Sequence, residues 1–129
     1  MARYEYLNIG ELNYRSIKAP DELTVNVSQA TNRTTGVTAS GVMGVITGRS
    51  DSLAAGAEAT FTVTNTRVTA TSVVLVSLQS SGAAPAGPSV PEVTTTAAGS
   101  FKITLSNLGT DADTTAAVIN YMVFNGSSI

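Results

Sequence analysis

The catalytic chemistry open to this chain is that of its carboxylates. Its 129 residues include no His, no Cys and no Trp, which excludes Ser–His and Cys–His nucleophiles and also imidazole or thiolate metal sites. Nine Asp and Glu remain, and the close groups among them are Asp21 with Glu22 and Asp111 with Asp113. Two carboxylates held across a cleft are the arrangement that hydrolyses glycosidic bonds.

Neither acidic group has the surroundings of a catalytic or metal site. Aromatic residues, which would form a substrate platform, make up 5% of the chain. Asp111 and Asp113 lie in a segment typical of a solvated polar connection between strands, and calcium prefers about 6 to 8 oxygen ligands. We therefore predict no enzyme activity, no cofactor and no metal, with a carboxylate hydrolase or a weak cation site at these two aspartates as the alternatives.

Charge and hydropathy narrow the possible partners. The net charge is −2, and the seven basic residues are spread from Arg3 to Lys102, so no field attracts nucleic acid. The longest strongly apolar run, 73–76, is far shorter than the roughly 20 residues that span a bilayer. The N-terminus also lacks the apolar run of a secretory signal. We expect a soluble protein that is assembled in a cytoplasm, with neither nucleic acid nor membrane as its partner.

The composition changes at about residue 22. The first 22 residues hold seven of the 16 charged residues and three of the four tyrosines, whereas the rest is mostly Thr, Ser, Ala, Val and Gly. Ala19 precedes Pro20, which favours extended backbone at the junction. We predict two parts, an N-terminal interaction arm over 1–22 and a single β-sheet body over 23–129.

Alternating apolar and polar residues predict strands through most of the body. In the segment 60–66, Phe61 and Val63 share one face and threonines the other. Residues 92–106 predict a β-hairpin with its turn at Ala98 and Gly99. Weaker strand patterns cover 23–28 and 42–47. Short strands at this spacing predict an all-β fold, an antiparallel β-sandwich of jelly-roll-like type.

Two further segments carry apolar side chains on both faces. They are 73–78 and 118–124, and a half-exposed antiparallel strand does not normally show this pattern. Such strands are either central in the sandwich or covered by a neighbouring subunit. Under the second interpretation we predict a subunit interface formed by Val74, Val76, Leu78, Tyr121 and Val123.

The segment 80–91 contains three of the four prolines. Proline removes a ladder donor and fixes φ, so this segment predicts a long surface loop rather than a strand. A loop of this length is either a plain connection between sheets or a binding element.

The arm offers apolar and aromatic side chains between charged ones. Ordering about 20 residues costs on the order of 20 to 40 kcal/mol of backbone entropy, so the arm is ordered only where these side chains are buried. It either wraps its own domain or docks on a partner, and tyrosine enrichment favours a partner. The candidate contact residues are Tyr4, Tyr6, Leu7, Ile9, Leu12 and Tyr14.

Five segments in order along the body form a recognisable pattern: 53–56, 60–66, 68–76, 98–103 and 117–123. Together they resemble the small β-sandwich of tailed-bacteriophage virion proteins, which occurs in capsid decoration (cement) proteins and in fibre tips. The resemblance spans about 53–125.

The resemblance implies a structural subunit without catalytic residues. Decoration proteins of this kind are usually homotrimers that bind the assembled major capsid protein and reinforce the shell, so the arm residues become the expected capsid contacts and the capsid surface the expected location. The chain has no long repetitive shaft, which favours decoration. The alternative is a fibre tip or receptor-binding protein, in which the 80–91 loop contacts the host surface.

Overall fold

The computed structural model describes residues 23–81 and 89–125. The predicted arm over 1–22, and with it the candidate capsid contacts from Tyr4 to Tyr14, lies outside the described residues, as does most of the 80–91 loop. The described chain is built of strands, which are β1 (Thr24–Ser28), β2 (Val37–Thr38), β3 (Met43–Thr47), β4 (Glu58–Thr64), β5 (Val73–Ser80), β6 (Ser89–Ala97), β7 (Ser100–Asn107) and β8 (Val118–Phe124).

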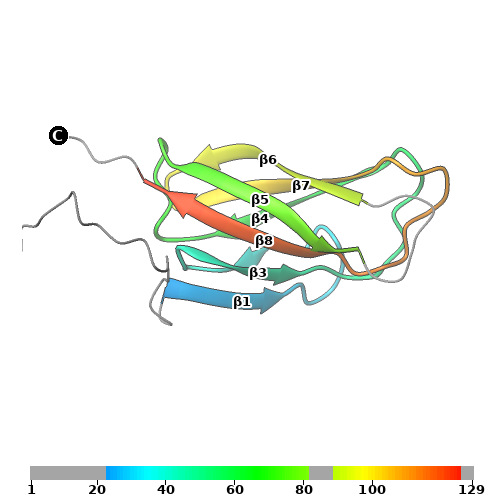
Figure 1. Ribbon diagram of the computed structural model, residues 1–129, viewed down its shortest axis with the longest axis horizontal. Coiled ribbons are helices and arrows are strands. Elements are labelled where there is room, and N and C mark those ends of the chain that lie inside the picture. Colours follow the sequence, from blue (N-terminus) through cyan, green and yellow to red (C-terminus); the bar gives the residue numbers. More distant parts are fainter. Residues whose placement is uncertain (1–22, 82–88, 126–129) are drawn as a thin grey trace, which may run out of the picture.

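These strands form two four-stranded sheets that pack as a sandwich (Figure 1). Sheet A has the order β1-β3-β8-β5, and sheet B has the order β2-β4-β7-β6. Among the described strands, every connection except the β6–β7 hairpin crosses from one sheet to the other. The predicted all-β sandwich is therefore confirmed.

The predicted antiparallel pairing is confirmed for four strand pairs and wrong for two, so both sheets are mixed. Strand β1 pairs with β3 in parallel, and β2 pairs with β4 in parallel. The cause lies in the crossing connections. The chain leaves sheet A after β1, runs through β2 in sheet B and returns to begin β3 in the same direction, as parallel neighbours require.

The predicted hairpin is confirmed, with β6 and β7 joined by a tight turn at Ala98 and Gly99. Gly99 has a φ of 83°, which glycine adopts without the steric cost of a Cβ. The predicted loop is shorter than expected, since β5 continues to Ser80 and Pro91 lies inside β6. Proline is tolerated there because β6 is the edge strand of sheet B.

The core lies between the two sheets and is filled by alternate residues of each strand. Tyr121 packs against Phe101 with ring centroids 5.8 Å apart, and its hydroxyl donates to the Ala39 carbonyl at 3.0 Å. Burial raises the pKa of the Tyr121 hydroxyl. The buried apolar residues are Val37, Ala39, Ile46, Leu53, Ala59, Phe61, Val63, Val68, Val74, Phe101, Ile103, Leu105, Ala117, Ile119, Tyr121 and Val123.

Close packing inside sheet A depends on Gly44 in β3. A Cβ at this position would lie 1.8 Å from the Val25 carbonyl oxygen and 2.8 Å from the Tyr121 ring. Any larger residue would therefore push β1 away or displace the tyrosine. The glycine holds the three strands β1, β3 and β8 at their observed spacing.

Candidate functional site

The outer face of sheet A, which points away from the sandwich, carries an unusual amount of exposed apolar surface. Val73 is 57% exposed, Leu75 56% and Phe124 48%. Met122 of β8 and Met43 of β3 lie beside them and are half-buried. Scattered single apolar residues are normal on a surface, whereas a contiguous group marks an interaction site.

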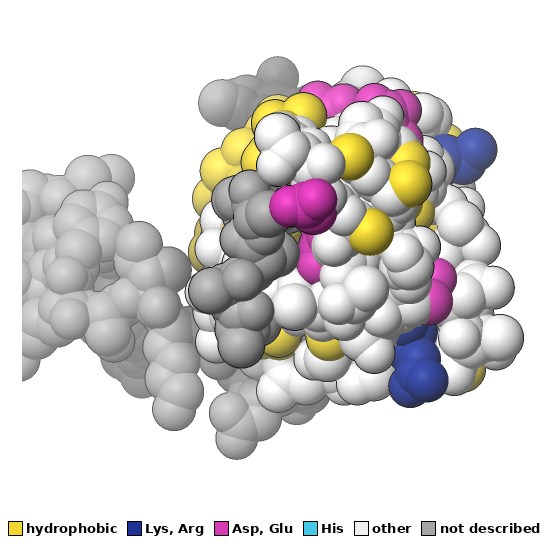
Figure 2. All heavy atoms as spheres, turned by 90° about the vertical axis from the view of Figure 1, so that its right-hand side faces the viewer, with side chains coloured by type: hydrophobic (Ala, Val, Ile, Leu, Met, Phe, Trp, Pro, Cys, Tyr) yellow, Lys and Arg dark blue, Asp and Glu magenta, His cyan; other side chains and the backbone are white. Residues whose placement is uncertain are grey.

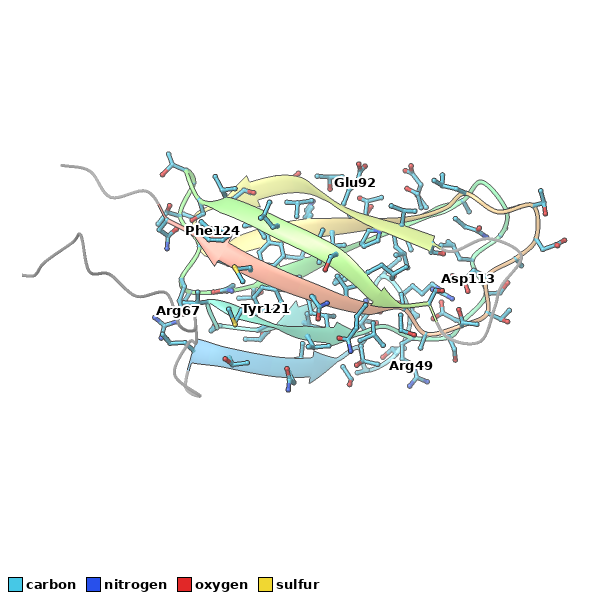
Figure 3. All side chains as sticks on the ribbon, viewed as in Figure 1. Arg49, Arg67, Glu92, Asp113, Tyr121 and Phe124 are labelled. Atoms are coloured by element: carbon cyan, nitrogen blue, oxygen red, sulfur yellow. The ribbon has the colours of Figure 1, made fainter. Side chains whose placement is uncertain are left out.

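Strand register brings these five side chains together. Val73 pairs with Phe124, and Leu75 pairs with Met122. Met122 in turn pairs with Met43 on its other side. The group, which we call the apolar cluster, therefore crosses three adjacent strands at the end of sheet A where β1, β3 and β5 begin and β8 ends (Figures 1 and 3).

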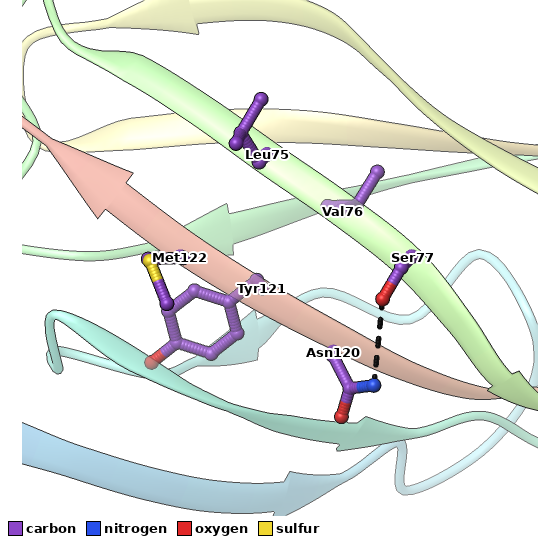
Figure 4. Close-up of a pocket in the computed structure, with 6 residues that line it drawn as sticks. All are labelled: Leu75, Val76, Ser77, Asn120, Tyr121 and Met122. Carbon is purple, nitrogen blue, oxygen red and sulfur yellow. Dashed lines mark hydrogen bonds between the residues drawn. The ribbon is translucent and has the colours of Figure 1, made fainter. Parts of the chain in front are cut away.

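The relief of this face is uneven. One hollow lies between β5 and β8 and is lined by Leu75, Ser77, Asn120 and Met122 (Figure 4). A second hollow lies on the other side of β8, over Met43 and Val45. Asn120 and Met122 line both hollows and so form a ridge between them.

The outer face also carries no charge. None of the four strands of sheet A contains Asp, Glu, Lys or Arg. Sheet B differs, because Glu58, Glu92 and Lys102 lie on its strands. Edge strands that meet water are usually protected by charges or proline, and the edge strand β1 has neither. The chain thus has one charged sheet and one sheet suited to contact with another protein.

The predicted interface residues lie on the same strands but on the opposite side. Val74, Tyr121 and Val123 are buried in the core, and Val76 and Leu78 pack against it. Their neighbours Val73, Leu75, Met122 and Phe124 are those that a second molecule can reach. Apolar residues on both faces of a strand marked these strands in the sequence, but that pattern does not say which face turns inward.

The two carboxylates of the predicted polar connection, Asp111 and Asp113, lie in different surroundings. Asp111 is exposed, whereas Asp113 is 1% exposed and lies 3.7 Å from the guanidinium of Arg33, which is 3% exposed. The expectation of a solvated segment is therefore wrong for Asp113. The backbone N–H and carbonyl of Asp113 bond to the carbonyl and N–H of Leu53, and this pairing holds the side chain in the interior.

Arg33 and Asp113 form the centre of a buried polar cluster. The Nη2 atom of Arg33 donates to the carbonyls of Asp113 at 2.9 Å and Thr115 at 2.8 Å. Its Nε donates to the Asp51 carbonyl, and its backbone N–H donates to the Asp51 carboxylate at 3.1 Å. The carboxylate of Asp113 accepts hydrogen bonds from Ser89 and from both the N–H and the hydroxyl of Thr115.

This cluster lies at the end of the sandwich opposite the apolar cluster (Figure 3). Figure 2 looks onto that end, where acidic and basic side chains are visible among hydrophobic and other side chains. The cluster joins the connections that follow β1 and β3 to the one that precedes β8 and to the start of β6. Apart from Nη1 of Arg33, which is buried without a hydrogen-bond partner, its polar groups bond to one another across these separate segments, so its role is to hold the segments together.

The Asp113 carboxyl makes the free energy of unfolding depend on pH in the acidic range. Burial raises its pKa, but the hydrogen bonds from Ser89 and Thr115, together with the charge of Arg33, outweigh burial and place the pKa below the ordinary 3.8. The ionised form therefore stabilises the fold above that value, and protonation removes the contribution as the pH falls through 3.8 and below. We expect the free energy of unfolding, measured by urea titration between pH 6 and pH 2, to fall more steeply in the natural chain than in Asp113→Asn. Equal slopes would contradict this prediction.

Within 23–81 and 89–125, the structure contains no group of three or more metal-ligating acidic, His or Cys residues. No helix in that part of the chain is long and apolar enough to cross a membrane. The comparisons with protein families, curated proteins and solved structures gave no match to this chain.

Proposed function

We propose that the protein is a structural subunit of a virion, a homotrimer that decorates a bacteriophage capsid and stabilises it by binding the assembled major capsid protein. The observation that supports this best is the uncharged apolar outer face of sheet A. A surface of this kind serves contact between proteins, since contiguous exposed apolar side chains are costly in water unless a partner covers them.

The proposal divides the work between the two parts of the chain. The sandwich, which we propose to be of jelly-roll-like virion type, supplies contacts between copies. The arm supplies the capsid contacts through Tyr4, Tyr6, Leu7, Ile9, Leu12 and Tyr14. In this proposal the protein is located on the capsid surface after assembly in the host cytoplasm. It catalyses no reaction and binds no cofactor or metal.

Copy number in purified particles tests the proposal. Decoration requires hundreds of copies per particle, because each capsid face repeats the binding site many times. We expect quantitative mass spectrometry to give a ratio to the major capsid protein that corresponds to hundreds of copies. A few to some tens of copies would favour the alternative, a fibre tip or receptor-binding protein that uses the 80–91 loop. Absence of the chain from particles would overturn both.

A further inference from the structure

We propose that the occupant of the outer face of sheet A is a second copy of this chain, with the apolar clusters of three copies meeting around the trimer axis. This inference rests on the homotrimer of the proposed function and names the surface that forms it. The residues that carry it are Met43, Val73, Leu75, Met122 and Phe124.

The charge distribution favours a second copy over other occupants. An uncharged apolar face excludes a charged partner surface, because burying a charge without a counter-charge is costly. Another copy of the same face brings no charge at all. The outer side of sheet B, with Glu58 and Lys102, would instead bring charges.

The arm is a poorer occupant for the same reason. Its 22 residues carry seven charges, so laying it over a face that offers no counter-charge would leave several of them near apolar side chains. Arg3 and Glu5 flank Tyr4, and Glu5 also precedes Tyr6. The arm is better matched to a partner with charges of its own.

The relief and the composition of the face also suit self-association. The ridge of Asn120 and Met122 lies between two hollows, so the ridge of one copy can enter a hollow of the next. Methionine adapts its shape to irregular gaps, and both Met122 and Met43 lie here. Next to the apolar cluster, Asn120 of β8 donates to Ser77 of β5 at 3.4 Å. These two polar side chains are therefore already hydrogen-bonded within one chain and need no partner from a second copy.

The test compares single charge substitutions in the full chain. Leu75→Glu and Phe124→Glu each place a carboxylate on the face, and both side chains are about half exposed, so the fold is retained. Leu108→Glu is the matched control, because Leu108 is 73% exposed and lies outside sheet A. Sedimentation velocity gives the mass of each variant, and circular dichroism verifies that each is folded.

We expect the natural chain and Leu108→Glu to have the mass of three chains and both face variants to have the mass of one. Because the chain has no cysteine, Met122→Cys provides a second measurement. A short bis-maleimide should link two copies through Cys at this position in most trimers, and Leu108→Cys should stay unlinked.

The remaining outcomes separate this inference from the proposed function. A trimer that persists in both face variants and is not linked through position 122 overturns the inference and leaves the trimer standing. A dimer that the face variants dissociate keeps a second copy as the occupant of the face but overturns the threefold arrangement and the proposed homotrimer. A monomeric natural chain overturns both, and if Leu75→Glu then makes residues 1–22 sensitive to protease, the face belongs to the arm.

Discussion

Replacing Arg33 with Met is expected to lower the free energy of unfolding by about 3 to 5 kcal/mol, the range for removing one partner of a buried ion pair. The guanidinium is 3% exposed and donates to three backbone carbonyls, those of Asp51, Asp113 and Thr115. Methionine has a similar length but donates nothing. The three carbonyls would each lose a donor, and the carbonyl and carboxylate of Asp113 would be left buried with fewer partners.

This loss of about 3 to 5 kcal/mol is large relative to the total stability of a domain. A domain is stable by about 5 to 15 kcal/mol, so Arg33→Met should unfold at a clearly lower urea concentration than the natural chain, and urea denaturation of the full chain measures this directly. The control is Arg67→Met, because Arg67 is exposed at the other end of the sandwich (Figure 3), where a substitution changes stability by about 0.5 kcal/mol or less. Equal midpoints for the two variants would contradict the structural role of the buried cluster.

The strands and the core were largely predictable from the sequence because period-2 alternation reports burial directly. Phe61 and Val63 of β4, and Phe101 with Ile103 of β7, are buried as their alternation predicts. The hairpin turn at Gly99 was also predictable, since its residue type matches the backbone conformation. In each case the information lies within a few consecutive residues.

The buried ion pair, the parallel pairing and the facing of β5 could not be predicted, because they depend on contacts between segments far apart in the sequence. Arg33 and Asp113 are 80 residues apart, and each looks like an ordinary polar loop residue in its own surroundings. The parallel pairing of β1 with β3 follows from a path through the other sheet. In β5, Val74 and Leu75 are equally apolar, and only the arrangement of the two sheets turns one inward and the other outward.

One signal of the candidate site was nevertheless present in the sequence. The segments that form β1, β3, β5 and β8 contain no charged residue, and those that form β4, β6 and β7 each contain one. Charged side chains keep the outer side of a sheet in water, so their absence from every strand of one sheet points to a covered sheet. The topology was needed to show that these four strands belong together.

Deleting residues 2–18 is expected to abolish binding to the capsid and leave the trimer intact, if the proposed division between arm and body is correct. The deletion removes Tyr4, Tyr6 and Tyr14, which are three of the four tyrosines, and with them the amphipathic contact area on which docking would depend. It leaves every residue of the apolar cluster in place. Cosedimentation with particles assembled without the protein measures binding, and sedimentation velocity of the free variant measures the trimer.

Comparison with a face variant makes this experiment specific. Leu75→Glu should give a monomer with a complete arm, which binds each capsid site through one arm instead of three. Linked arms gain affinity through effective concentration, by factors of about 100 to 10,000, so this monomer should bind weakly but detectably. The arm deletion should not bind at any concentration tested. Unchanged capsid occupancy by the deletion would refute the docking role of the arm, and loss of the trimer on deletion would show that the arm also holds the copies together.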